Sequence, residues 1–379
     1  MSNTYSLQAF LLVLFKLIYL CVKITSIMKI SITGTGSHYP SQIVKNDTFL
    51  NHEFLDMDGS AFDAENDIII EKFKAITGIE ERKYADHNLN TSDLGIDASK
   101  KAIADAGIDQ EELDYIIFAH NFGDIKYGQN QSDTLPSLAT RVKHGLGIKN
   151  PNCVAYDVLY GCPGWVEGMI QAYAFIKAGM AKKCLVIGGE TLSRVVDPHD
   201  RDSMIYADGA GATIVEVTED GGEYLSTGSQ TFAFDEAKYL FFGESYNEEA
   251  TEDQRYIKMY GRKIYEFAVT HVPAAIKAAI DQSGVDILDI KKIFIHQANE
   301  KMDDAIIKRL YRLYKMKVPE GVMPMNIQTF GNSSVATVPT LFDLVCKNQL
   351  EGHQINKGDV CVFASVGAGM NINAIVYRY

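Results

Sequence analysis

The sequence lacks the cysteine patterns of disulfide-rich and metal-binding proteins. Its six cysteines include no Cys-x-x-Cys pair and follow no disulfide framework, and most lie in apolar strand or helix patterns, at positions 21, 153, 162, 184, 346 and 361. Cysteines of this kind are typical of reduced thiols, so we predict a cytoplasmic protein. The sequence has no His/Cys cluster and no glycine-rich phosphate loop between a strand and a helix. We therefore expect neither a metal nor another cofactor.

Basic residues are in the minority. The chain has 36 Lys and Arg against 49 Asp and Glu, which gives a formal net charge of −13 at pH 7. This excess of negative charge argues against a nucleic-acid partner. With 379 residues, 46% of them hydrophobic, the chain is long enough for two domains or one large two-part domain.

No apolar run is long enough for a stable membrane span. The run from Ala9 to Val22 is interrupted by Lys16 and is shorter than the about 20 residues that a spanning helix needs. It has no basic start and no small-residue cleavage site, so it is also a poor signal peptide. We expect the fold to begin near Met28 and not to need residues 1–27. That extension is either an upstream translation artefact or a loose membrane-facing helix.

Strand-like and helix-like patterns alternate along the chain and predict an α/β fold. Amphipathic patterns predict helices at 93–106, ending at Gly107, from about Pro136, and from Cys162 to about Lys177. Apolar runs predict strands at 29–34, 114–120, 153–160, 184–188 and 213–217.

The second half of the sequence repeats the first. The helix end at 102–108 is followed by a strand ending in His120, and the similar helix end at 279–285 is followed by a strand ending in His296. This self-similarity indicates an internal duplication.

Cys162 and Asn332 occupy comparable places in the two copies, each in a turn that opens a helix leading to a strand. We divide the chain into two halves. The first, 28–217, carries Cys162, and the second, 218–379, carries His296 and Asn332. If these halves pack pseudo-symmetrically, Cys162 and Asn332 face each other at two helix N-termini, and His296 ends a neighbouring strand.

The turn around Cys162 favours a reactive thiol. Pro163 suits the first position of a helix, which places Cys162 at the N-cap, beside unpaired N–H groups and the positive end of the helix dipole. Such a place lowers a thiol pKa. From this turn alone, a buried structural cysteine is an equally good interpretation.

Cys162, His296 and Asn332 together suit thioester chemistry. A thiolate attacks an acyl thioester and carries the acyl group, and two side-chain donors on one thioester carbonyl stabilise an enolate. Taken singly, His296 fits a core histidine and Asn332 a helix cap; at duplicated positions we interpret them as a catalytic set. The backbone N–H groups of Cys162 and of Gly369, in the Gly-Ala-Gly turn at 367–369, are expected to form the oxyanion hole for acyl transfer.

Four motifs resemble those of β-ketoacyl-[acyl-carrier-protein] synthase III, of the thiolase superfamily. They are Gly-Cys-Pro-Gly at 161–164, His-Gln-Ala-Asn at 296–299, Gly-Asn-Ser-Ser at 331–334 and Asp-Gly-Ala-Gly-Ala at 208–212. The resemblance runs from about Met28 to Tyr379. It implies a thiolase-like five-layered αβαβα fold, a homodimer, and a catalytic triad at Cys162, His296 and Asn332.

The resemblance also implies a reaction. Cys162 takes an acyl group, and decarboxylation of malonyl-ACP gives the enolate that attacks it, in fatty acid or polyketide-type secondary metabolite synthesis. The alternative is acyl transfer to a hydroxyl or amine without decarboxylation. A Cys-His-Asn hydrolase and a non-catalytic partner subunit fit these residues less well.

Two departures from the family bear on the acyl donor. Members that use acyl-CoA carry a Trp and an Arg just before their Thr-Gly-Ile, whereas here Ile76 precedes Thr77 and the single Trp is Trp165, beside the nucleophile. We therefore expect a carrier-bound or unusual acyl group rather than a standard acyl-CoA.

The helix after His296 carries Lys301, Lys308 and Arg309, with Lys301 where the family places a carrier-protein contact. We predict these three as carrier-protein-binding residues. The basic face is either a dock for an acidic acyl carrier protein or a solvated helix surface.

Overall fold

The computed structural model describes residues 29–250 and 254–379. The prediction that residues 1–27 are not needed by the fold concerns a segment outside the described residues. Within the described ranges, no helix is both long and apolar enough to cross a membrane.

The first sheet has five strands in the order β1-β7-β6-β4-β5. The β1–β7 and β7–β6 pairs are antiparallel, and β4 pairs in parallel with β6 and β5. The strands are β1 (Lys29–His38), β4 (Tyr115–Ala119), β5 (Val154–Val158), β6 (Lys183–Thr191) and β7 (Asp208–Thr218).

The second sheet repeats this arrangement in the order β8-β13-β12-β11. Its strands are β8 (Glu223–Thr231), β11 (Ile290–Ile295), β12 (Val360–Gly367) and β13 (Asn371–Arg378). The directions match as well, since β8–β13 and β13–β12 are antiparallel and β12–β11 is parallel. A backbone hydrogen bond of 2.8 Å from Ile293 to Val322 places the chain near Val322 beside β11. The internal duplication is therefore present in the fold.

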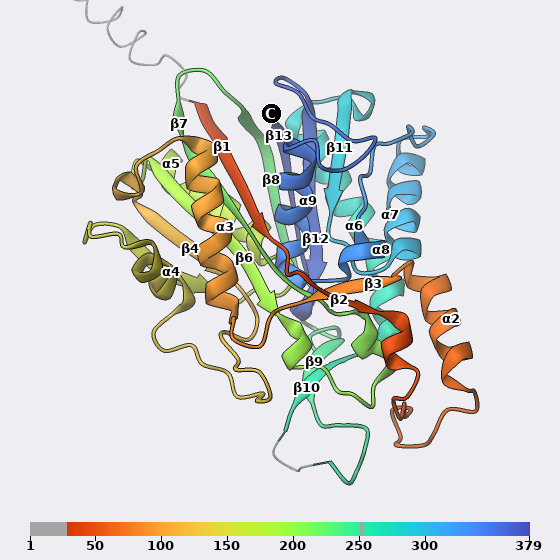
Figure 1. The fold of residues 1–379 in the computed structure, drawn as a ribbon. Coiled ribbons are helices and arrows are strands. Elements are labelled where there is room, and N and C mark those ends of the chain that lie inside the picture. Colours follow the sequence, from red (N-terminus) through yellow and green to blue (C-terminus); the bar gives the residue numbers. More distant parts are fainter. Residues whose placement is uncertain (1–28, 251–253) are drawn as a thin grey trace, which may run out of the picture.

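The sheets and helices form five layers (Figure 1). Helices α3 (Thr91–Ala106) and α4 (Leu138–Leu146) cover the outer face of the first sheet, and α6 (Gly261–Ser283) and α7 (Glu300–Leu313) cover that of the second. Between the sheets lie α5 (Gly164–Lys177) and α9 (Thr337–Cys346), whose apolar side chains share one core with both sheets. Trp165 belongs to this central core, edge-on to Phe363. The αβαβα prediction is confirmed.

Equivalent helices end in the same way because glycine stands at the same place in each repeat. Gly107 after α3 and Gly284 after α6 are both left-handed C-caps, with φ of 65° and 72°. Such caps satisfy the last helical carbonyls, and glycine adopts them without strain. The start of α3 is fixed by a capping box between Asn90 and Asp93.

Smaller elements surround one end of the two sheets. Two strand pairs, β2–β3 and β9–β10, and the helices α2 and α8 lie there, and their apolar side chains form a separate core. Their bounds are β2 (Gln42–Lys45), α2 (Asn66–Thr77), β3 (Glu81–Tyr84), β9 (Leu240–Gly243), β10 (Tyr256–Met259) and α8 (Ile327–Phe330).

The predicted start of the strand at Thr213 is wrong, because β7 already begins at Asp208. Glycine is unfavourable inside a strand, so the sequence at 209–211 does not predict one, but these residues belong to β7. A Cβ atom on Gly211 would lie 2.6 Å from the Cβ of Pro339 in α9. The predicted division between halves at 217/218 falls at the end of β7, and whether the halves are separable domains stays a prediction.

Gly36→Ala should destabilise the fold, because β1 touches the backbone of α3 at this point. A Cβ atom on Gly36 would lie 2.4 Å from the Ala98 carbonyl oxygen and 2.5 Å from the Ala102 nitrogen. We expect the free energy of unfolding to fall by about 1–3 kcal/mol in denaturant titration. The control is Gly228→Ala in β8, where the added methyl group meets open space and the change should stay within about 0.5 kcal/mol. Equal unfolding midpoints for the two variants would contradict this account of the β1–α3 contact.

Candidate active site

Cys162 lies in the turn between β5 and α5. The first helical residue is Gly164 and Pro163 is the N-cap, so the predicted N-cap position of Cys162 is wrong by one residue. The reason is that the Pro163 carbonyl accepts the first helical hydrogen bond, from the Glu167 N–H, at 2.9 Å.

His296 follows the last residue of β11 and is buried. Its Nδ1 lies 2.7 Å from the Thr337 hydroxyl, which donates its own hydrogen to the Ser334 carbonyl at 2.9 Å. Thr337 therefore accepts from Nδ1–H, and Nε2 of the neutral ring is left as an acceptor. Burial lowers the pKa of His296 to about 4, which keeps the ring neutral at pH 7. With this tautomer, Nε2 can accept a proton as a base. We expected from the sequence that His296 would instead donate a hydrogen bond to the thioester carbonyl.

Asn332 lies between α8 and α9 and is also buried. Its backbone N–H donates to the Ile205 carbonyl at 2.9 Å, and its Oδ1 accepts from the Ser334 N–H at 2.8 Å. Because Oδ1 is used in this way, the amide group is oriented with Nδ2 as the available donor.

Ser334 joins the three predicted residues. Its hydroxyl donates to Cys162 Sγ at 3.2 Å, its N–H donates to Asn332, and its carbonyl is linked through Thr337 to His296. The structure thus brings Cys162, His296 and Asn332 together around one turn.

A buried carboxyl group lies behind this turn. Glu190 Oε1, at the end of β6, accepts from the backbone N–H and from the Nδ2 of Asn121, at 2.7 and 2.5 Å. Asn121 Nδ2 also donates to the Ser334 hydroxyl at 3.1 Å. Burial raises the pKa of Glu190 to about 8.

The Cys162 thiol is protonated at neutral pH. Burial raises its pKa to about 11, against a lowering by the Ser334 hydrogen bond and a further raising by Glu190. The prediction of a lowered thiol pKa is therefore wrong, because desolvation of the thiolate is the largest influence on this group. A base must take the proton if the sulfur is to react.

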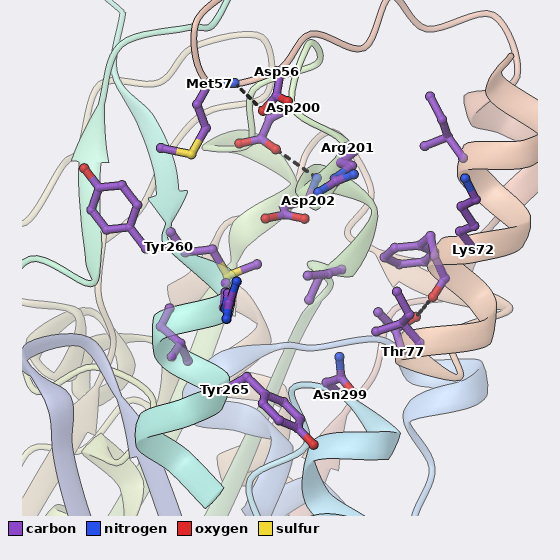
Figure 2. A pocket seen from close by; sticks show the side chains of 18 of the residues that line it. Asp56, Met57, Lys72, Thr77, Asp200, Arg201, Asp202, Tyr260, Tyr265 and Asn299 are labelled. Atoms are coloured by element: carbon purple, nitrogen blue, oxygen red, sulfur yellow. Dashed lines mark hydrogen bonds between the residues drawn. The ribbon is translucent and has the colours of Figure 1, made fainter. Parts of the chain in front are cut away.

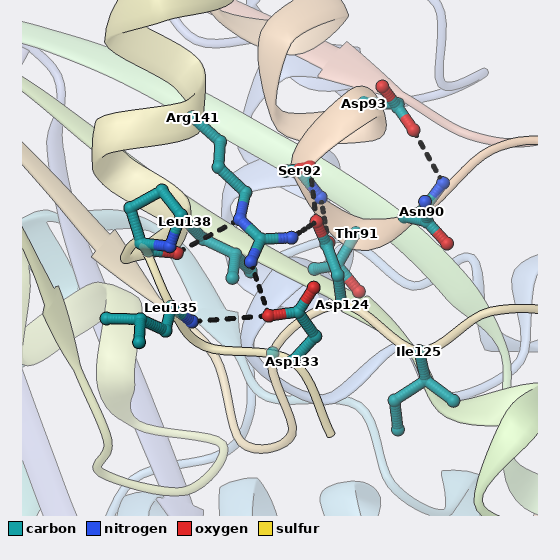
Figure 3. Close-up of polar contacts among 12 residues, drawn as sticks. Asn90, Thr91, Ser92, Asp93, Asp124, Ile125, Asp133, Leu135, Leu138 and Arg141 are labelled. Carbon is teal, nitrogen blue, oxygen red and sulfur yellow. Dashed lines mark hydrogen bonds and ion pairs between the residues drawn. The ribbon is translucent and has the colours of Figure 1, made fainter. Parts of the chain in front are cut away.

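The loop that begins at Asn121 is anchored by charged groups (Figure 3). Asp124 accepts from the N–H and hydroxyl of Ser92 at the start of α3, and Arg141 of α4 bridges Asp124 and Asp133 at 2.8 and 2.6 Å. These contacts tie both ends of the loop to the helices of the first layer, which fixes the backbone that carries Asn121.

The glycine-rich turn at 367–369 packs directly on Cys162. A Cβ atom on Gly367 would lie 2.5 Å from the Cys162 nitrogen, so only glycine allows this approach. Gly369 follows in a left-handed conformation with φ of 75°. The oxyanion-hole roles of Cys162 and Gly369 stay predictions.

A cavity of about 770 Å³ lies between α2 and the start of α6 (Figure 2). Its wall includes Ile205, whose carbonyl accepts the hydrogen bond from the Asn332 N–H. The wall also includes Ala298 and Asn299, which follow His296 closely in sequence. The cations at its lining are Lys72, Arg201, Arg262 and Lys263.

The predicted carrier-binding residues all project from α7 into solvent. Lys301 and Arg309 are exposed, and Lys308 pairs with Asp304 at 3.4 Å. None of the three lines the cavity. Within the described ranges, no group of His, Cys, Asp and Glu side chains is placed to hold a metal ion.

The sequence analysis missed Ser334, Thr337, Asn121 and Glu190. Ser334 stood inside a quoted motif, but nothing in that motif shows a contact with Cys162, which lies 172 residues away. The other three act through hydrogen bonds that only the folded chain reveals.

Comparison with known proteins agrees with this fold. Residues 156–231 match the 3-oxoacyl-[acyl-carrier-protein] synthase III family, and residues 280–379 match its C-terminal region. β-Ketoacyl-[acyl-carrier-protein] synthase III of Erythrobacter litoralis is 30% identical over 93% of this chain and its own full length, and that of Caldanaerobacter subterraneus is 31% identical over 95% and 99%. The crystal structure of 3-oxoacyl-[acyl-carrier-protein] synthase III from Aquifex aeolicus superimposes with a TM-score of 0.76 at 28% identity, covering 92% of this chain and all of that one. The chain belongs to the 3-oxoacyl-[acyl-carrier-protein] synthase III family of condensing enzymes.

Proposed function

We propose that the protein is an acyltransferase that loads an acyl group on Cys162 and condenses it with malonyl-ACP, with loss of carbon dioxide. The observation that carries this proposal is the shared turn at Ser334, which contacts Cys162 and Asn332 directly and His296 through Thr337. The product belongs to fatty acid or polyketide-type synthesis.

In the loading step, His296 Nε2 takes the proton of the Cys162 thiol. The sulfur attacks the acyl carbonyl, and the C–S bond to the donor breaks as the tetrahedral intermediate collapses. The donor leaves as a thiol because its sulfur takes the proton that His296 had received. The oxyanion of this step faces the backbone N–H groups of Cys162 and Gly369 in our proposal.

In the condensing step, the malonyl carboxylate leaves as carbon dioxide, and its electron pair forms the enolate of the thioester. In this proposal the free donor Asn332 Nδ2 stabilises the enolate oxygen, whereas His296 Nε2 donates only when it carries a proton. The enolate carbon then attacks the acyl group, and the Cys162 sulfur leaves as a thiolate. A proton taken up from solvent restores the thiol, since the decarboxylation itself releases none.

Acyl transfer to a hydroxyl or amine would use the same Cys162 and His296. It gives Asn332 no enolate to stabilise, yet the Asn332 amide is held by hydrogen bonds on its backbone and on its Oδ1. We therefore favour condensation.

A carrier-bound donor suits the cavity better than an acyl-CoA. Ile76, which lines the cavity, is apolar at the place of the family's cation, and Phe62 covers the Arg201 guanidinium at 4.8 Å. One face of that cation is thus taken by the protein itself. The basic residues Lys301, Lys308 and Arg309, with Lys72 and Lys263 at the cavity, are proposed to attract an acidic carrier protein.

The free edge of β5 is our proposed homodimer interface. Among the residues that the structure describes, this strand pairs only with β4, and Val154, Leu159 and the nearby Leu135 are 46%, 66% and 88% exposed. An open apolar edge pairs readily with another strand. The five described cysteines are all unpaired, which fits the proposed cytoplasmic location.

Replacing catalytic residues should separate the two half-reactions. Cys162→Ala should accept no acyl group, and Asn332→Ala should still load but release carbon dioxide from malonyl-ACP about 10²–10³ times more slowly, because one enolate donor is lost. His296→Ala should slow both steps. Intact-protein mass and carbon dioxide release measure the two steps, and buried Cys153→Ala is the loading control. Carbon dioxide release by Asn332→Ala at the parent rate would favour acyl transfer instead.

The parent enzyme should load from an acyl-ACP with a higher kcat/KM than from the matching acyl-CoA. Raising the salt concentration should reduce the ACP value, because docking to a basic face is screened. Ile76→Arg should raise kcat/KM for the CoA thioester a few-fold by adding a cation at the cavity. Ile68→Arg, on the same helix but outside the cavity lining, is the control. A parent enzyme that prefers the CoA thioester would refute the donor assignment.

Light scattering should give about twice the chain mass of 42.1 kDa. Val154→Lys should shift the protein toward the monomer, since a lysine on a free strand edge opposes pairing. Leu288→Lys, at another exposed apolar position, should leave the mass unchanged. A dimer that survives Val154→Lys at low concentration would place the interface elsewhere.

A further inference from the structure

Ser334 has a strained backbone in the centre of the site. It is a non-glycine residue with φ of 51°, and only 4% of it is exposed. A left-handed conformation costs a residue with a side chain on the order of 1–2 kcal/mol. Glycine at this position would remove the strain but would also remove the hydroxyl group. The hydroxyl is therefore the feature that serine adds to the site.

The hydrogen bonds around Ser334 have a fixed direction. A carboxyl oxygen of Glu190 accepts from the N–H and the Nδ2 of Asn121. The second hydrogen of Nδ2 then points to the Ser334 oxygen, at 3.1 Å. Because the Ser334 oxygen accepts there, its single hydrogen is free to point to Cys162 Sγ, at 3.2 Å.

We propose that Ser334, oriented by Asn121 and Glu190, is a positioning residue that holds a hydrogen-bond donor on the Cys162 sulfur and so stabilises the thiolate. This inference rests on the proposed function, in which that thiolate takes the acyl group. It adds a residue whose effect is on the nucleophile rather than on the substrate.

The charge on Glu190 works in the opposite direction from the Ser334 donor. The Ser334 hydrogen bond lowers the pKa of the Cys162 thiol, and Glu190 raises it. Since burial raises the pKa of Glu190 itself to about 8, this carboxyl group is largely neutral at pH 7 and ionises at higher pH. The other ionisable groups near these two are His296 after β11, Tyr206 ahead of β7, whose pKa is raised by burial, and Asp208 at the start of β7, whose charge also raises the pKa of Glu190.

The test is the rate at which iodoacetamide alkylates Cys162 between pH 7 and 10, followed by peptide mapping. Ser334→Ala should react about tenfold more slowly than the parent at a given pH, because a hydrogen bond to a charged sulfur is lost. Ser333→Ala, whose side chain makes no hydrogen bond within the described residues, should keep the parent profile.

Ser334→Gly distinguishes positioning from a purely structural role. It removes the hydroxyl and relieves the strained φ, so we expect a Tm equal to or above that of the parent together with the same loss of reactivity. Asn121→Ala should lose part of the reactivity, since the Ser334 hydroxyl is then free to rotate. Glu190→Gln should react faster than the parent above pH 8, where the parent carboxylate opposes the thiolate.

A Ser334→Gly protein that is folded and has the parent alkylation profile would overturn the inference. So would a Glu190→Gln protein that is slower than the parent at every pH. Mapping of the acyl group in the parent to a residue other than Cys162 would instead overturn the proposed function, and the alkylation rates still report on Ser334 in that case.

Discussion

The site depends on how closely the start of α9 approaches the first sheet. A Cβ atom on Gly188 of β6 would lie 2.4 Å from the Val335 carbonyl oxygen, and one on Gly211 of β7 would lie 2.6 Å from Pro339. Without side chains at these two positions, the turn from Asn332 to Thr337 reaches the thiol of the other half. The duplication supplies two helix starts, and these glycines let them meet.

Burial in this central layer sets both proton-carrying groups to their neutral forms. It raises the pKa of Cys162 to about 11 and lowers that of His296 to about 4, so the resting pair is a thiol and an imidazole rather than an ion pair. Separating charge in this setting is costly, and local donors must offset part of that cost. Ser334 is the donor that the structure places on the sulfur, and Asn332 is the donor that we propose for the enolate.

Much of the fold could be predicted because local signals and packing agree. Gly107 and Gly284 mark equivalent helix ends through the left-handed cap, and the apolar strands of both halves were readable. The start of β7 was not, because glycine weakens a strand pattern, and here Gly211 is needed for the close contact with α9. The duplication allowed the meeting of Cys162, His296 and Asn332 around one turn to be predicted. The direction of the thiol pKa depends instead on burial, and the sequence does not show how buried a turn becomes.

Two residues of the site have strained backbone conformations, each of which lowers the stability of the fold. Ser334 and Met370 are both left-handed without being glycine, with φ of 51° and 48°, and they lie in the two turns that enclose Cys162. Strain of this kind persists only where the surroundings hold it, and it concentrates at functional sites. At Ser334 the holding contacts are the same hydrogen bonds that orient Asn332, Thr337 and the Cys162 sulfur. The network that maintains the strained turn is therefore also the network that positions the nucleophile and its donors. Replacing Ser334 by alanine removes the hydroxyl but keeps the strained backbone, whereas replacing it by glycine removes both, so the two variants together separate the effect of the strain from that of the hydroxyl.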